Sequence, residues 1–443
     1  MWLLLYLTII GAVGYAAAAA IIGRDRRGIV ELFALGATLG LGTVGTLLLW
    51  LSMLGIAPSR REILLIGLCA FLAIVLLDRL GRCPRVSWPT LALRDWPSVL
   101  PLAVIVYCMV VVTVAAVAFG AYETDAFAIW GLKAKVLAAE PLRPRPEYFR
   151  DRTLSYSHLD YPLLVPALQA GAYAMLGRID DRWGKIIFPL MYLAMGAVVY
   201  AALRRGLNRL MSLLLVALLM GAPAVVRWAG PGVADIAVAL FGACAVAYAN
   251  DWIRRGDRRA LCIASASCVF LAMTKQEGLV FAILMALALL LRHLRSSSIA
   301  ILCAALALAP WFIWSFGIPR THEAYGARLT SAHLFTNLSP LKPICLGFGT
   351  QFTDLQGWGI LWPLLLICAI FGARGFRQRE IIAVWFVLVL QLLAYATAYL
   401  ITPWDLDVLI PMTIRRLLLQ VAPVAVLLIG MHASVLLPPP RDA

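Results

Sequence analysis

The chain has 443 residues, of which 63% are hydrophobic and 14% are charged, and its mean hydropathy is +0.88. A soluble domain is about half apolar and a quarter charged, so a water-exposed globule of this composition would carry large apolar patches. These values exclude a soluble protein and predict an integral membrane protein. The net charge of +15 indicates basic cytoplasmic loops. It does not indicate a nucleic-acid surface, because no polar segment carries basic residues interleaved with aromatics.

Apolar runs of about 20 residues recur along the whole chain, and each is long enough to cross roughly 30 Å of hydrocarbon as a helix. Backbone amides must be satisfied internally in that solvent, and the alternating pattern of barrel strands is absent. We therefore expect an all-α polytopic membrane protein. The runs lie near residues 1–22, 29–56, 62–80, 98–119, 161–177, 185–203, 209–226, 232–250, 260–273, 278–291, 298–317, 356–372, 380–401 and 417–436.

The links between these runs are of two kinds. The strongly basic links belong to the cytoplasm by the positive-inside rule, and they contain Arg24/Arg26/Arg27, Arg79/Arg82/Arg85/Arg94, Arg204/Arg205/Arg209, Arg254/Arg255/Arg258/Arg259, Arg292/Arg295 and Arg374/Arg377/Arg379. The other links then lie outside, at 57–61, 120–184, 227–235, 274–278, 318–355 and 402–416. Because both flanks of the run 161–177 fall outside, we expect that run to lie at the outer interface or to be re-entrant. The prediction is thirteen crossings, with the amino terminus outside and the carboxyl terminus inside.

The pattern divides the chain into three regions. Residues 1–97 form amino-terminal transmembrane helices, and residues 98–436 form a second transmembrane module. That module carries two long outer loops, at 120–184 and 318–355, and residues 437–443 form a frayed tail.

The first long outer loop contains a helix-like stretch from Thr124 to Glu140 in which aromatics and lysines share a short amphipathic segment. This composition is typical of a helix that lies on the bilayer surface. Lys133, within the stretch, is a candidate substrate-binding residue.

Two acidic groups of this loop are candidates for chemistry. Asp125, with Glu123 two residues before it, follows a crossing, and a carboxylate at that boundary can act as a general base on an acceptor hydroxyl. The structural alternative is a solvated helix cap. His158 and Asp160 are followed by Tyr161 and a proline, an arrangement that suits a substrate or metal site. Its alternative is a polar loop end with a tyrosine anchor at the interface.

Two later segments place cations at the outer boundary. Lys275 and Glu277 form a charged break between two short apolar runs, where charges are costly and tend to be paired or functional. Lys275 can neutralise a phosphate, with Glu277 as its partner, although an ordinary outer turn is the alternative. Arg415 and Arg416 lie on the outer side, against the usual charge bias, and a bidentate phosphate is a natural partner for a guanidinium. The alternative is a pair that snorkels to headgroups.

Arg227 and Asp235 add a further outer charge pair, either structural or functional. Each of these signals is weak alone, but the acids, the histidine and the cations all gather on one face. A pocket in the membrane plane with a base and several phosphate-binding cations fits transfer from a lipid-phosphate donor.

The same residues resemble those of the type C integral-membrane glycosyltransferases, which include protein O-mannosyltransferases and bacterial aminoarabinose transferases. The resemblance covers roughly residues 98–436. It is carried by Asp125, the stretch from His158 to Pro162, the stretch from Lys275 to Gly278, and the pair Arg415/Arg416.

The resemblance implies inverting transfer of a sugar from a polyprenyl phosphate to an acceptor hydroxyl, on a glycolipid, polysaccharide or protein, at the periplasmic face of a bacterial inner membrane. Asp125 would be the catalytic base. Lys275, Arg415 and Arg416 would stabilise the departing phosphate, and His158 and Asp160 would shape the sugar or acceptor site. Some members of the group need a divalent metal and others do not, so a metal remains open. The nine cysteines include no C-x-x-C pair.

Two other functions remain as alternatives. A transporter or flippase of lipid-linked sugar would place polar groups near the bilayer midplane on interrupted helices, whereas here they gather at one face, which favours an enzyme. A polymerase or ligase of surface polysaccharide would also use lipid-linked sugar, but it would transfer a chain.

Overall fold

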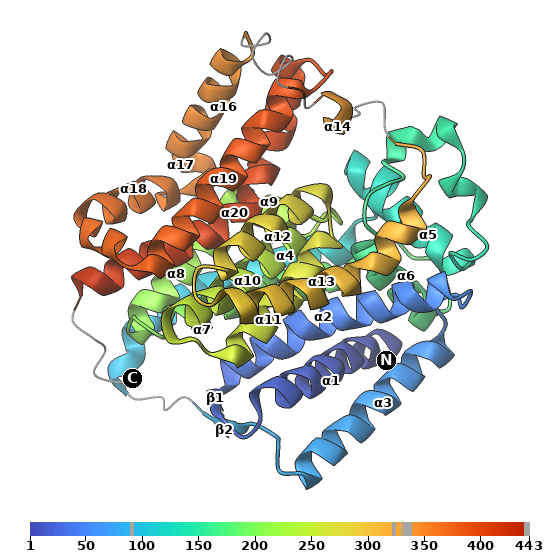
Figure 1. The fold of residues 1–443 in the computed structure, drawn as a ribbon, viewed down its shortest axis with the longest axis horizontal. Coiled ribbons are helices and arrows are strands. Elements are labelled where there is room, and N and C mark those ends of the chain that lie inside the picture. Colours follow the sequence, from blue (N-terminus) through green and yellow to red (C-terminus); the bar gives the residue numbers. More distant parts are fainter. Residues whose placement is uncertain (89–92, 321–324, 329, 331–338, 438–443) are drawn as a thin grey trace.

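The protein is all-helical apart from one short sheet, as seen in a computed structural model that describes residues 1–88, 93–320, 325–328, 330 and 339–437 (Figure 1). Eight of the described helical segments are long and apolar enough to cross a membrane. The chain is therefore a multi-pass membrane protein. The segments contain α1 (Trp2–Ile22), α2 (Ile29–Met53), α4 (Val99–Ala118), α7 (Ile187–Leu203), α10 (Asp235–Arg255), α13 (Leu294–Ser315), α19 (Arg379–Ile401) and α20 (Leu406–Leu436). With the 3-10 turns that precede them, the segments of α4 and α7 begin at Trp96 and Trp183.

The expected number of thirteen crossings is not confirmed. A ninth span arises only if α8 (Arg209–Gly221) and α9 (Pro223–Ala229), which meet at an angle of 62°, are counted as one broken helix. Other apolar runs form helices of 11 to 15 residues, and at 1.5 Å per residue these reach only about 17–23 Å. They are α6 (Leu164–Leu176), α11 (Arg258–Ala272), α12 (Gln276–Leu289) and α18 (Leu361–Phe371).

Apart from α3 (Arg60–Arg79), a 20-residue helix that packs against α1, the remaining regular elements are short. The other helices are α5 (Leu132–Ala139), α14 (Tyr325–Arg328), α16 (Leu341–Thr353) and α17 (Leu355–Trp358). A π-helix, η2 (Ala126–Gly131), precedes α5, and the 3-10 helices are η1 (Leu93–Ser98), η3 (Glu147–Phe149), η4 (Arg152–Ser157), η5 (Trp183–Ile186) and η6 (Ala373–Arg377). The strands β1 (Arg26–Gly28) and β2 (Arg85–Ser87) pair in parallel and join the first two basic links.

Glycines allow α1 and α2 to approach each other closely. A Cβ atom on Gly14 would lie 1.7 Å from the carbonyl oxygen of Gly36, and one on Gly40 would lie 2.0 Å from that of Ile10. Gly36 and Gly40 are four residues apart, the small-residue spacing that lets helix backbones approach within a membrane. Any larger side chain at Gly14 would push the two helices apart.

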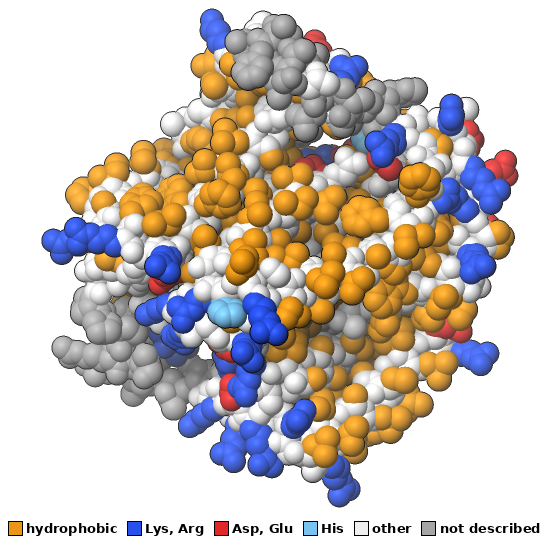
Figure 2. Space-filling view, viewed as in Figure 1, with side chains coloured by type: hydrophobic (Ala, Val, Ile, Leu, Met, Phe, Trp, Pro, Cys, Tyr) orange, Lys and Arg blue, Asp and Glu red, His pale blue; other side chains and the backbone are white. Residues whose placement is uncertain are grey.

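The helix α10 is the centre of the bundle, with 94% of its span buried, and it packs against α7, α11, α12 and α20. By contrast, only 11% of the α13 span is buried, so its side chains are left to the lipid. Figure 2 shows the corresponding apolar face, on which hydrophobic side chains form a continuous band and basic side chains gather beneath it. This distribution places the bilayer around the bundle.

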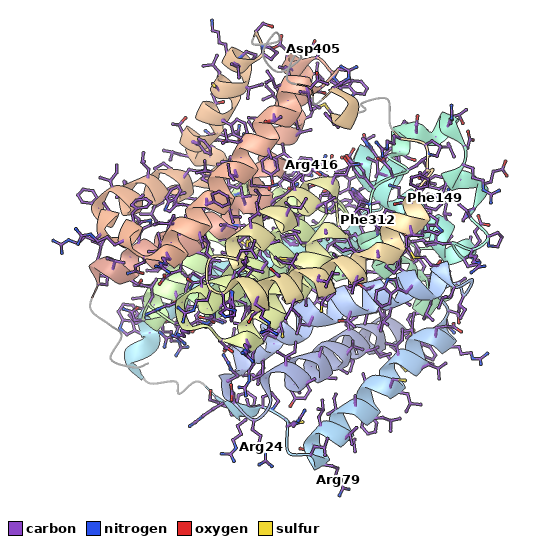
Figure 3. The ribbon with its side chains drawn as sticks, viewed as in Figure 1. Arg24, Arg79, Phe149, Phe312, Asp405 and Arg416 are labelled. Atoms are coloured by element: carbon purple, nitrogen blue, oxygen red, sulfur yellow. The ribbon has the colours of Figure 1, made fainter. Side chains whose placement is uncertain are left out.

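The two ends of the molecule differ in chemistry. Arg24 and Arg79 lie at the end that carries the short sheet, and Phe149, in the segment between α5 and α6, lies toward the other end (Figure 3). The 21 residues of α10 run from Asp235 to the basic link at Arg255, which is about 30 Å at 1.5 Å per residue. Asp235 is therefore about one hydrocarbon thickness away from the basic end.

The loops expected on the outer side are more structured than the sequence indicates. The stretch from Thr124 to Glu140 is helical over 126–139, as predicted, but Lys133 is fully buried, so its lysine face packs into the protein instead of facing a bilayer surface. The run 161–177 becomes the buried 13-residue helix α6, which packs against α2 and α5. Its length of about 20 Å fits the expected non-crossing segment. Much of the loop 318–355 and nearly all of the tail 437–443 lie outside the described residues.

Candidate functional site

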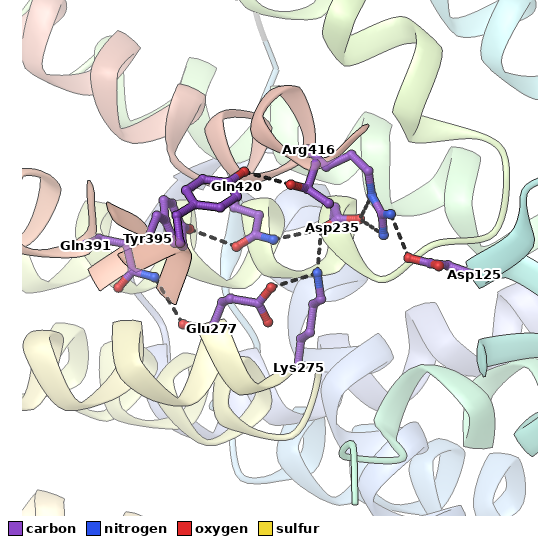
Figure 4. Close-up of polar contacts among 10 residues, drawn as sticks. Asp125, Asp235, Lys275, Glu277, Gln391, Tyr395, Arg416 and Gln420 are labelled. Atoms are coloured by element: carbon purple, nitrogen blue, oxygen red, sulfur yellow. Dashed lines mark hydrogen bonds and ion pairs between the residues drawn. The ribbon is translucent and has the colours of Figure 1, made fainter. Parts of the chain in front are cut away.

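A fully buried carboxylate, Asp235, is the hub of a charged cluster at the end of the bundle opposite the basic links (Figure 4). It is the first residue of α10, where the helix dipole favours a negative charge. Its Oδ1 accepts hydrogen bonds from Lys275 Nζ at 3.2 Å and Gln420 Nε2 at 2.7 Å, and its Oδ2 accepts one from Arg416 Nε at 3.0 Å. A buried charge is tolerated only with such pairing.

Arg416 joins this hub to Asp125. Its Nη1 donates to Asp125 Oδ2 at 2.6 Å, while its Nε and Nη2 both lie 3.0 Å from Asp235. The guanidinium also lies over the ring of Trp228, 5.2 Å from the ring centre. The Asp125 side chain is 34% exposed whereas that of Asp235 is 0% exposed, so Asp125 is the carboxylate of this pair that an incoming molecule can reach.

Lys275 brings a second carboxylate, Glu277, into the cluster. Lys275 Nζ lies 2.8 Å from Glu277 Oε1. Lys275 immediately precedes α12 and Glu277 lies in the first turn of α12, which places both beside the start of α10. The second oxygen of Glu277, Oε2, is buried and has no hydrogen-bond partner among the described residues. The cluster thus retains an acceptor that the described part of the chain leaves unused.

Polar residues of α19 and α20 close the other side of the cluster. Tyr395 donates its hydroxyl to Gln420 Oε1 at 2.8 Å, and Gln391 donates to the backbone carbonyl of Glu277 at 3.1 Å. Gln420 is thereby oriented so that its amide nitrogen faces Asp235. These contacts tie the hub to α12, α19 and α20.

The loop before α6 packs beside the cluster. Lys133 donates to the backbone carbonyl of His158 and lies over the ring of Tyr161, 5.3 Å from its centre, while the rings of His158 and Tyr161 stack at 4.4 Å. Asp160 accepts a hydrogen bond from Gln276 Nε2 at 3.0 Å, which ties the loop to the first residue of α12. His158 has a positive φ of 51°, an uncommon backbone conformation for a residue other than glycine.

Burial controls the charge of these loop residues. It lowers the pKa of Lys133 to about 7, against the opposing field of Asp160, and it raises the pKa of Asp160 itself. Burial, together with the positive charges of Lys133 and Lys275, lowers the pKa of His158 to about 4, although Asp125 acts in the opposite direction. His158 is therefore neutral at neutral pH, and its ring serves as a polar stacking surface instead of a cation.

The structure brings together eight of the ten residues predicted from the sequence. They are Asp125, Lys133, His158, Asp160, Tyr161, Lys275, Glu277 and Arg416. Glu123 instead pairs with Arg227. Arg415 points from the next position of α20 toward Asp354, whose Oδ2 lies 2.8 Å from Arg415 Nη2.

The hub itself was missed. The sequence pairs Arg227 with Asp235, but the structure separates them, because Arg227 contacts Glu123 and Tyr122 while Asp235 meets Lys275 and Arg416. One signal was present: Asp235 begins a long apolar run, where an acid is costly unless it is paired. Gln420 carried a second signal, since it lies four residues after Arg416 and so shares its helix face.

The described residues contain no group of three His, Cys, Asp or Glu side chains that could hold a metal ion. Comparison of the chain with protein-family models, with curated proteins and with solved structures found no match. Any function must therefore be argued from the chemistry of the cluster.

Proposed function

We propose that the protein is a glycosyltransferase of a bacterial inner membrane that moves a sugar from a polyprenyl phosphate to an acceptor hydroxyl at the periplasmic face. The observation that carries the proposal is the contact between Asp125 and Arg416, a reachable carboxylate held against a buried cation. Group transfer from a phosphate needs both groups, one to take a proton and one to stabilise the leaving charge.

The reaction assigns a role to each part of the cluster. The acceptor oxygen attacks the anomeric carbon from the side opposite the phosphate and gives its proton to Asp125. The bond between the anomeric carbon and the phosphate oxygen breaks, and the lipid phosphate leaves with the electron pair, so the configuration inverts. Arg416 and Lys275 stabilise the negative charge on that oxygen. Tyr161 and His158 offer flat surfaces beside the reacting sugar.

The level of the cluster supports an enzyme that draws its donor from the membrane. From Arg416 to the end of α20 at Leu436 the helix runs about 30 Å, so Arg416 and Asp235 both lie one hydrocarbon thickness from the basic end. The phosphate of a polyprenyl lipid lies at this boundary, with its chain in the hydrocarbon. A transporter would instead need such groups near the midplane.

The test is complementation of a strain that lacks the protein, followed by mass spectrometry of its surface glycolipids and glycoproteins. The wild-type chain should restore a species that is heavier by one sugar residue, and Asp125→Asn should abolish it while the protein still inserts. Asp181→Asn is the matched control, since Asp181 is an outer-loop carboxylate that pairs with Lys135 at 2.8 Å, away from the cluster. Full restoration by Asp125→Asn would remove Asp125 as the base.

A further inference from the structure

A groove of about 670 Å³ runs between α11 and α13, starting at the basic end of the molecule. Both helices begin at a basic link and contribute facing stripes of small side chains, among them Cys262 and Ala266 of α11 and Ala300 and Cys303 of α13. These side chains are too short to fill the space between the helices. The hydroxyl of Ser265, which also lines the groove, is buried and has no hydrogen-bond partner among the described residues.

The mouth of the groove is cationic. Arg258 and Arg295 line it, both are exposed, and neither forms an ion pair within the described part of the chain. His293 caps α13 by accepting the backbone N–H of Ser296 on Nδ1, so its Nε2 carries the proton and can donate. The neighbouring acid, Asp257, is engaged as the cap of α11. Figure 2 shows basic side chains gathered at this end, below the apolar band.

We propose that this groove is a binding site for an anionic glycerophospholipid of the leaflet at the basic end. Arg258, Arg295 and His293 contact the headgroup phosphate, and the acyl chains lie along the apolar walls toward Cys303. Ser265, seven residues from Arg258 on α11 and hence about 10 Å deeper, donates to an ester carbonyl. Basic recesses between transmembrane helices on this side of a membrane are suited to anionic headgroups. A zwitterionic lipid would bring an ammonium group against two arginines.

Two native thiols provide the readout, because Cys262 and Cys303 line the groove and are both exposed. The purified full-length chain in dodecyl maltoside would be titrated with palmitoyl-oleoyl phosphatidylglycerol, and N-ethylmaleimide labelling of each cysteine measured by mass spectrometry. The lipid should slow labelling of both thiols and leave Cys69 of α3, an exposed thiol outside the groove, unaffected.

Replacing both mouth arginines separates headgroup recognition from simple apolar filling. The double variant Arg258→Gln/Arg295→Gln should raise the lipid concentration for half-protection roughly thirtyfold, the effect of two cationic contacts. The double variant Arg79→Gln/Arg82→Gln, at other exposed positions of the same basic end, should not change it. Equal protection by phosphatidylcholine, protection by inorganic phosphate alone, or unchanged protection in the first variant would each overturn the proposal.

Discussion

The adjacent arginines of α20 allow the energetic role of the buried cluster to be measured against a built-in control. Arg416→Met removes a guanidinium whose side chain is 10% exposed and which pairs with Asp125 and with the fully buried Asp235. Breaking a buried ion pair costs about 3–5 kcal/mol, because the remaining charge stays buried. Asp235 keeps its contacts with Lys275 and Gln420, so we expect the free energy of unfolding to fall by an amount at the lower end of this range, about 3 kcal/mol.

Arg415→Met is the matched control. The Arg415 side chain is 49% exposed and pairs with Asp354, and an exposed ion pair contributes no more than about 1 kcal/mol. Both variants replace an arginine by methionine, at neighbouring positions of the same helix. The difference in the free energy of unfolding between them should therefore be about 2 kcal/mol or more.

The assay is equilibrium unfolding in mixed micelles with an increasing fraction of sodium dodecyl sulfate. Asp235→Asn should partly restore the stability of Arg416→Met, since it removes one of the buried carboxylates that are in excess once Arg416 is lost, although it destabilises the wild-type chain. The effects of Asp235→Asn and Arg416→Met on the free energy of unfolding should therefore be strongly non-additive. Equal losses in the two arginine variants, within about 0.5 kcal/mol, would refute the reasoning that the cluster is an energetically coupled unit.

Three further outcomes are expected. Burial lowers the pKa of Lys133 from its ordinary value of 10.5 to about 7 in the folded chain. Between these two values the unfolded chain binds more protons than the folded chain, so the free energy of unfolding should rise with pH across this window. Lys133→Met should abolish that rise in the micelle assay. Gly14→Val should destabilise the protein by about 3 kcal/mol or more through overpacking, whereas Gly11→Val, with nothing within 4 Å of its Cβ position, should have little effect. In a background without native cysteines, an impermeant maleimide should label Arg178→Cys from outside intact cells and should leave Arg255→Cys unlabelled.

The sequence predicted the class of fold more reliably than the helix count. Hydropathy records where the chain is apolar, and the structure confirms a multi-pass helical protein. Hydropathy does not show where a helix begins and ends. The runs at 260–273 and 278–291 were therefore counted as two crossings, whereas they form the short helices α11 and α12. The turn between them carries Lys275 into the cluster.

Burial explains why some site residues were predicted and others were not. Arg416 was detected because an arginine on the predicted outer side opposes the usual charge bias. Its neighbour Arg415 carried the same signal but faces Asp354, since consecutive helical residues point about 100° apart. Asp235 was assigned the wrong partner because pairing between distant helices depends on tertiary packing, which charge spacing along the chain does not specify.

The contact between Asp125 and Arg416 has a consequence for donor binding. Asp125, Asp160, Asp235 and Glu277 outnumber the nearby cations, and Arg416 is already occupied by carboxylates. Under the proposed function, a lipid phosphate must therefore compete with Asp125, the exposed partner. Asp125→Asn should tighten the binding of a fluorescent polyprenyl phosphate about fivefold, the value of one partly exposed ion pair, even though the same change abolishes transfer. Asp181→Asn should bind as the wild type does. Weaker binding by Asp125→Asn would mean that Asp125 helps to hold the donor, so the base and the phosphate would not share Arg416.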